Sequence, residues 1–130
     1  MKRLTLFTAA IVLLLGLLLS ACGSGTPAPT PTPTEPPGDP VLGKNAYLST
    51  CIACHGPDAK GVPNLGKDLT TSEFVKSKTN AEMIAFIQTG RPATDPLNTT
   101  GVDMPPRGGN PALSDDDLLN IVAYLRSIQQ

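Results

Sequence analysis

The residues of this chain that could do chemistry gather in one pentapeptide, Cys51-Ile52-Ala53-Cys54-His55. On a helix, positions i, i+3 and i+4 lie on one face, so Cys51, Cys54 and His55 point the same way. Two such thiols can form thioether bonds with the two vinyl groups on one porphyrin edge, and the imidazole can bind the iron. This spacing is the attachment signature of haem c. Because His55 is the only histidine, the pentapeptide predicts one covalently attached haem c with His55 as an axial ligand.

Two cysteines three residues apart also occur in thioredoxin-like redox pairs, in zinc sites and, rarely, in local disulfides. A thioredoxin-like pair needs a βαβ setting, and no strand pattern surrounds Cys51 and Cys54. A structural zinc site needs four protein ligands. The one other cysteine, Cys22, lies in a segment that indicates a different role. Haem attachment is therefore the favoured interpretation.

The elements that must position these residues are helical. Helices are predicted over Pro40 to Ser49, over Thr71 to Lys76, over Ala81 to Thr89 with Asn80 as the N-cap and Gly90 as the stop, and after Ser114. The first of these runs directly into the pentapeptide. Residues 91–113 are rich in proline and glycine and show no periodic element. No strand pattern is evident, so the fold class is predicted to be all-α.

The last predicted helix carries the clearest signals. Ser114 is its N-cap, with Asp117 at the reciprocal position of a capping box. Its predicted buried stripe consists of Leu118, Ile121, Val122, Leu125 and Ile128. The carboxylates of residues 115–117 could suggest a metal cluster, but three acidic residues at a helix start are explained by the helix dipole.

The N-terminus indicates secretion. Residues 1–3 are a short basic start, Leu4 to Leu19 is an apolar run, and small residues lead to Cys22. The tetrapeptide Leu19-Ser20-Ala21-Cys22 resembles the lipobox of bacterial lipoproteins. That resemblance implies cleavage of residues 1–21 and acylation of Cys22. An uncleaved signal anchor is the alternative, because the apolar run is nearly long enough to span a bilayer. Either way, the rest of the chain is expected outside the cytoplasm and held at a membrane.

Residues 22–40 are predicted to be the lipidated cysteine and a linker. Gly23 to Pro40 contains seven prolines, which favours polyproline II and a reach on the order of 50 Å. The linker could be a tether that lets a head domain, residues 41–130, move along the membrane, or a mere spacer. Lys2 and Arg3 would leave with the signal, so eight basic residues face eleven acidic ones. A net charge of −3 without a basic patch excludes a nucleic-acid binder.

The head resembles class I cytochromes c. Gly43 and Tyr47 precede the haem motif, and Tyr124-Leu125 matches the aromatic-aliphatic pair on the last helix of that family. The resemblance implies that these two helices cross, with the glycine allowing close approach, around one haem c. It also implies that the segment Gly66-Lys67-Asp68-Leu69 contributes to the haem site. Lys67 departs from the family, which usually has a proline whose carbonyl accepts the second ring N–H of the proximal histidine.

The resemblance also implies a sixth ligand. The family uses a methionine in a loop before the last helix, and Met104 has that position, followed by two prolines. A thioether is a soft ligand, and prolines stiffen the loop that must hold it. Met83 is the rival, but it lies within a predicted helix, where methionine more often fills a core. Cys51, Cys54, His55, Leu69 and Met104 are therefore the expected haem-binding residues.

An iron with both axial positions filled has no free site for a substrate, so the expected role is one-electron transfer and not enzymatic catalysis. The head would accept electrons from one redox complex of a respiratory or photosynthetic chain and pass them to another, with no small-molecule substrate. Two other possibilities stay open. The chain could be a fixed haem c subunit of a quinol-oxidising or oxidase complex, or, with Met104 off the iron, a haem-based ligand sensor.

Charge could guide docking of the head. Lysines around an exposed haem edge can steer an acidic partner. The candidates are Lys60, Lys67, Lys76 and Lys78. Ordinary solvated lysines are the alternative explanation.

Overall fold

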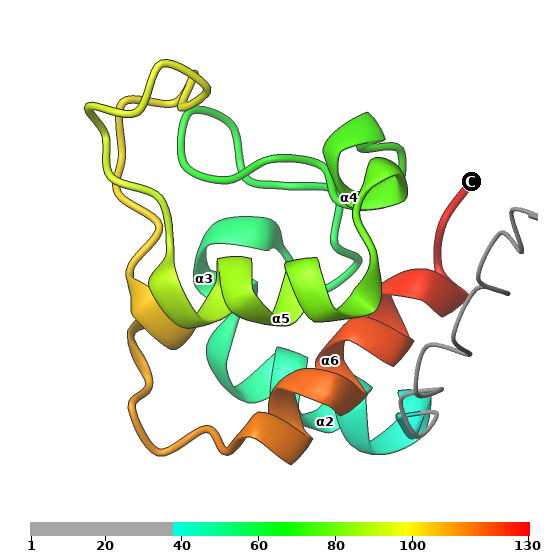
Figure 1. Cartoon of the computed structure of the whole chain (residues 1–130). Helices are drawn as coiled ribbons and strands as arrows, with labels where there is room; N and C mark the ends of the chain where they lie inside the picture. Colours follow the sequence, from blue (N-terminus) through cyan, green and yellow to red (C-terminus); the bar gives the residue numbers. More distant parts are fainter. Residues whose placement is uncertain (1–37) are drawn as a thin grey trace, which may run out of the picture. The chain divides into compact units, whose positions relative to one another are not determined.

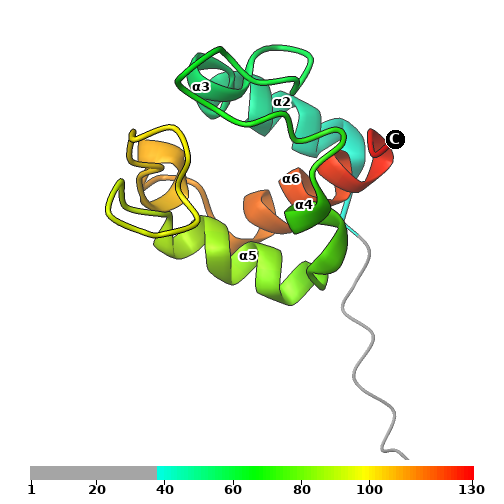
Figure 2. The same ribbon diagram turned by 90° about the horizontal axis from the view of Figure 1, so that it is seen from above.

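The computed structural model describes residues 38–130, which form helices around a central cavity (Figures 1 and 2). In chain order these are α2 (Pro40–Thr50), α3 (Ile52–His55), α4 (Glu73–Ser77), α5 (Asn80–Thr89), the 3-10 helix η1 (Pro106–Gly109) and α6 (Asp115–Ser127). The predicted all-α class is confirmed. Within residues 38–130 the only β feature is an isolated bridge between Arg91 and Met104. The predicted signal segment, residues 1–21, Cys22 and most of the linker lie outside the described residues.

Helices α2 and α6 pack directly on each other, as the class I cytochrome c resemblance implied (Figure 1). Gly43 makes this possible, because a Cβ at this position would lie well inside 3.0 Å of the backbone of Asn120. Tyr47, one turn later, is fully buried, and its ring lies 5.3 Å from that of Tyr124. Its hydroxyl donates to the carbonyl of Gly56, 2.7 Å away. The Tyr47 hydroxyl thereby holds the residue at which α3 ends.

The helix starts follow from capping. Asp39 caps α2, and the Ser114–Asp117 capping box of α6 is confirmed with both reciprocal bonds present. The predicted N-cap of α5 was wrong. Thr79, not Asn80, is the N-cap, because its hydroxyl accepts from the backbone N–H of Glu82 while the Glu82 carboxylate accepts from Thr79 in return.

Helix α6 supplies much of the core. Leu118, Ile121, Val122 and Leu125 are buried as predicted, whereas Ile128 is only partly buried because the helix ends at Ser127. Near its C-terminus, Arg126 ties α6 to the corner between α4 and α5. Its guanidinium donates to the carbonyls of Val75 and Lys78 and to the side chain of Asn80, 3.1 Å away. The predicted short helix over Thr71 to Lys76 is α4, shifted by one or two residues.

The described residues contain no helix that is both long and apolar enough to cross a membrane.

The contact at Gly43 gives a stability prediction. Gly43→Ala places a methyl group against the backbone of Asn120, which cannot rotate away as a side chain could. The two helices must separate, and we expect a loss of about 1–3 kcal/mol in the free energy of unfolding. Denaturant titration of the haem-loaded protein measures it. Val41→Ala, on the same helix at a side chain 68% exposed, is the control and should change stability by less than about 0.5 kcal/mol. Equal stability of both variants would contradict the close-packing argument.

Candidate haem-binding site

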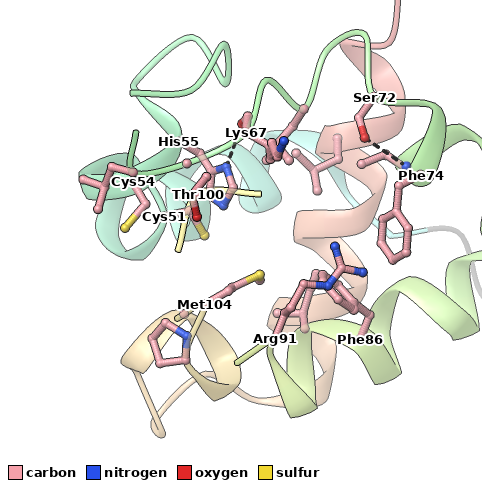
Figure 3. Close-up of a pocket in the computed structure, with 18 of the residues that line it drawn as sticks. Cys51, Cys54, His55, Lys67, Ser72, Phe74, Phe86, Arg91, Thr100 and Met104 are labelled. Carbon is pink, nitrogen blue, oxygen red and sulfur yellow. Dashed lines mark hydrogen bonds between the residues drawn. The ribbon is translucent and has the colours of Figure 1, made fainter. Parts of the chain in front are cut away.

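A cavity of about 550 Å³ opens between the motif helix α3 and the loop that carries Met104 (Figure 3). Its size lies within the ordinary range for sites that hold organic ligands and cofactors. Its lining is mostly apolar and includes Phe74, Phe86, Ile121 and Leu125. The five haem-binding residues expected from the sequence all contribute to it: Cys51, Cys54, His55, Leu69 and Met104. Cys22, the expected lipidation site, lies outside the described residues.

Both cysteines of the motif are free thiols that line the cavity. Cys51 lies at the junction of α2 and α3, and Cys54 lies within α3. Figure 3 shows both sulfur atoms on the side of α3 that faces the Met104 loop. Burial, and secondarily the neighbouring Cys54, raises the pKa of the Cys51 thiol to about 11. A thioredoxin-like pair works through a thiol of lowered pKa, so the structure disfavours that alternative.

The His55 ring is oriented by one backbone group. Its Nδ1 lies 2.9 Å from the carbonyl oxygen of Lys67. A carbonyl can only accept, so Nδ1 carries the proton and Nε2 keeps its lone pair for a metal. Lysine therefore provides the carbonyl that the family usually takes from a proline. Gly66 allows the segment that contains Lys67 to lie close to α3, since a Cβ at Gly66 would overlap the Cys54 carbonyl.

Met104 lies across the cavity from His55 (Figure 3). Its backbone pairs in both directions with Arg91, through two N–H···O bonds of 2.8 Å each. Gly90, at a φ of +71°, leaves room for the Met104 carbonyl, which a Cβ would strike. The rival Met83 also reaches the cavity, but it is 3% exposed and belongs to the apolar core between α5 and its neighbours.

Arg91 is a cavity residue that the sequence analysis missed. Its guanidinium lies over the rings of Phe74 and Phe86, with its central carbon 4.7 and 4.8 Å from the two ring centroids. The available signal was an arginine directly after Gly90, the glycine that ends α5. Phe86 lies on the preceding helix α5, but Phe74 comes from α4, so the local sequence does not reveal that the guanidinium contacts both rings.

The four lysine candidates for docking differ in their surroundings. Lys76 pairs with Glu73 at 3.1 Å, and Lys78 pairs with Glu82 at 3.8 Å, both at the surface. These two fit the alternative of ordinary solvated lysines. Lys67 lines the cavity, and its ammonium donates to the hydroxyl of Thr99. Lys60 is exposed and does not line the cavity.

The residues present fit haem c better than a zinc ion. Among residues 38–130 no group of three or more histidine, cysteine, aspartate or glutamate side chains could hold a metal ion. At the start of α6, Asp117 closes the capping box with Ser114, and Asp115 accepts hydrogen bonds from Arg107 and Gln88. Two thiols on one edge, an oriented imidazole on one wall and a thioether on the other, around an apolar volume, match the donor set of a thioether-linked haem.

Comparisons with known proteins agree with this geometry. Residues 38–125 match the family described as "Cytochrome C oxidase, cbb3-type, subunit III". Cytochrome c-555 of Chlorobaculum thiosulfatiphilum is 31% identical over 87 residues, which cover 67% of this chain and 93% of that protein. The cbb3-type cytochrome c oxidase subunit CcoP of Rhodobacter capsulatus is 29% identical over 89 residues, which cover 68% of this chain and 29% of that subunit. The chain thus matches less than a third of the length of CcoP, and no solved structure matches it.

The family match covers the haem motif, the histidine-orienting segment and both crossing helices. With the site geometry, it shows that this chain belongs to the cytochrome c family of the cbb3-type oxidase subunit III kind, whose members bind haem c covalently and transfer electrons.

Proposed function

We propose that the chain carries one electron on a haem c that Cys51 and Cys54 attach and that His55 and Met104 ligate from opposite sides. One observation carries the proposal: His55 and Met104 face the same apolar cavity from opposite walls, with the two thiols beside them (Figure 3). When bound, the haem supplies a reversible ferric/ferrous couple. The residues of the chain hold it, orient it and control its surroundings.

Each residue has a defined task in this proposal. The Lys67 carbonyl holds the His55 ring so that Nε2 faces the cavity. Met104 would supply the second protein ligand to the iron, and its thioether would favour the reduced state relative to a second histidine. The apolar lining, including Leu69, keeps water from the iron and favours the less charged state further. Together these contacts support electron transfer without substrate binding.

The site of action is proposed from the N-terminal sequence. Acyl chains on Cys22 would hold the protein firmly at a membrane, outside the cytoplasm. The proline-rich linker would let the head reach redox complexes as electron donor and acceptor. We therefore propose a tethered shuttle in a respiratory or photosynthetic chain.

A fixed haem c subunit of an oxidase complex is the second candidate. The observation that favours it is the match to the cbb3-type subunit family and to CcoP, although the chain covers only 29% of CcoP. Mild detergent extraction followed by affinity purification separates the two. A stoichiometric oxidase on the purified protein would support the fixed subunit, and a head that separates freely from every complex would support the shuttle.

The ligand assignment predicts an optical change in Met104→Ala. The oxidised protein should show the weak long-wavelength band of a methionine sulfur on ferric haem. Met104→Ala should lose this band completely, because the opposite wall then offers no sulfur. The mutant should also bind carbon monoxide readily when reduced. Absorption spectra of both oxidation states measure both effects.

Met83→Leu is the matched control for that experiment. Met83 is buried in the core, and replacement by leucine nearly conserves its volume, so we expect a stability loss under about 1.5 kcal/mol and an intact band. Loss of the band in this variant instead would show that Met83 is the ligand. A wild-type protein that lacks the band and binds carbon monoxide would favour the ligand-sensor alternative.

The anchoring proposal predicts the effect of Cys22→Ser. A serine cannot carry the thioether-linked lipid, so labelled fatty acid should be incorporated into the wild-type protein and not into Cys22→Ser, with the haem spectrum unchanged. Metabolic labelling of the two proteins measures the difference, and the mass of the wild-type protein shows whether residues 1–21 are removed. A wild-type protein that takes up no label and keeps residues 1–21 would instead support the uncleaved anchor.

A further inference from the structure

Arg91 stands at the point where α5 ends and the loop toward Met104 begins. Its side chain is only 17% exposed and lines the cavity close to Met104 (Figure 3). Neither the haem motif nor the axial ligands account for a buried cation at this position. Its contacts indicate what it does.

The Arg91 side chain is restrained from three directions. Phe74 of α4 and Phe86 of α5 lie edge to face, with their centroids 4.8 Å apart. The guanidinium lies over both rings, at 4.7 and 4.8 Å. Its Nε lies 3.5 Å from the carboxylate of Asp95, an ion-pair distance, and makes no hydrogen bond. A planar cation that contacts two packed rings and a carboxylate has little freedom to move.

The backbone of the same residue holds Met104. The Arg91 N–H donates to the Met104 carbonyl and the Met104 N–H donates to the Arg91 carbonyl, both at 2.8 Å. Within residues 38–130 this pair is the only β-bridge. Residues 92–103, which connect the two bridged residues, form a loop without strand or helix. The two rings therefore restrain Arg91, and Arg91 restrains Met104.

From these contacts we infer that Arg91 is a positioning residue that keeps the Met104 sulfur at the iron by tying the ligand loop to α4 and α5. The inference rests on the proposed role of Met104 as the sixth ligand. Without the guanidinium over the two rings, the bridge would lose its anchor and the Met104 sulfur would leave the iron more often. The fold itself depends on other contacts, chiefly those of α2 and α6.

Imidazole titration of the oxidised, haem-loaded protein tests this inference. Imidazole can enter the sixth position only when the sulfur has left, so its apparent affinity scales with the fraction of open molecules. For Arg91→Gln we expect imidazole to bind about tenfold more tightly than to wild type, the result of a tenfold larger open fraction.

Lys78→Gln is the matched control. Its ammonium also lies over the Phe74 ring, at 5.7 Å, but Lys78 has no contact with the Met104 backbone. Removal of this cation should leave the imidazole affinity unchanged. If imidazole bound both variants more tightly by a similar factor, the effect would be a general one of lost charge, and the inference would be overturned.

The same comparison in a Met104→Ala background separates positioning from electrostatics. Once the sulfur is gone, Arg91→Gln has nothing left to release, so its effect on imidazole binding should vanish. An equal effect in both backgrounds overturns the inference. Failure of the proposed function would appear differently, as a wild-type protein that lacks the methionine band.

Arg91→Lys is a second variant that keeps the test possible if Arg91→Gln does not fold. Lysine keeps the charge but lacks the planar, delocalised guanidinium that contacts both rings. We expect an imidazole affinity between those of wild type and Arg91→Gln, with the band retained. If Arg91→Gln does not fold, Arg91→Lys carries the test alone, and an affinity equal to that of wild type contradicts the proposed role.

Discussion

The close approach of α2 and α6 at Gly43 is the constraint on which the rest of the structure depends. It buries Tyr47 beside Tyr124, and the Tyr47 hydroxyl then holds the Gly56 carbonyl at the end of the haem motif. The same α6 carries Ile121 and Leu125 into the cavity lining and, through Arg126, fixes the corner between α4 and α5. A single residue without a side chain thus allows α2, which leads into the haem motif, to pack on the helix that contributes Ile121 and Leu125 to the cavity.

Local patterns predicted much of this arrangement. The spacing of Cys51, Cys54 and His55, and the Ser114–Asp117 capping box, depend on residues within one helical turn, and the structure brings them together as predicted. The wrong N-cap predicted for α5 shows the limit of such local patterns, since threonine and asparagine, at positions 79 and 80, both favour the N-cap. The deciding signal was Glu82, which stands three residues after Thr79 and closes the capping box.

Long-range contacts could not be predicted in this way. Arg91 lies 17 residues after Phe74 in the sequence, and no local pattern marks their contact. The same applies to the His55 partner. The residue at position 67 departs from the family, but the bond uses a backbone carbonyl, so the side chain could change while the acceptor stayed. A backbone interaction can survive a substitution that a sequence comparison would treat as significant.

The attachment of the first described residues to the head has a mechanical consequence. The Asp39 N–H donates to the Asn120 side chain at 2.7 Å, and a Cβ on Gly38 would strike the Leu119 carbonyl, so the chain enters the head against the middle of α6. Tension along the preceding chain would reach the most deeply packed helix first. A pull transmitted through the proposed linker would therefore load the contact between the start of α2 and the middle of α6, away from the loop that carries Met104 in sequence.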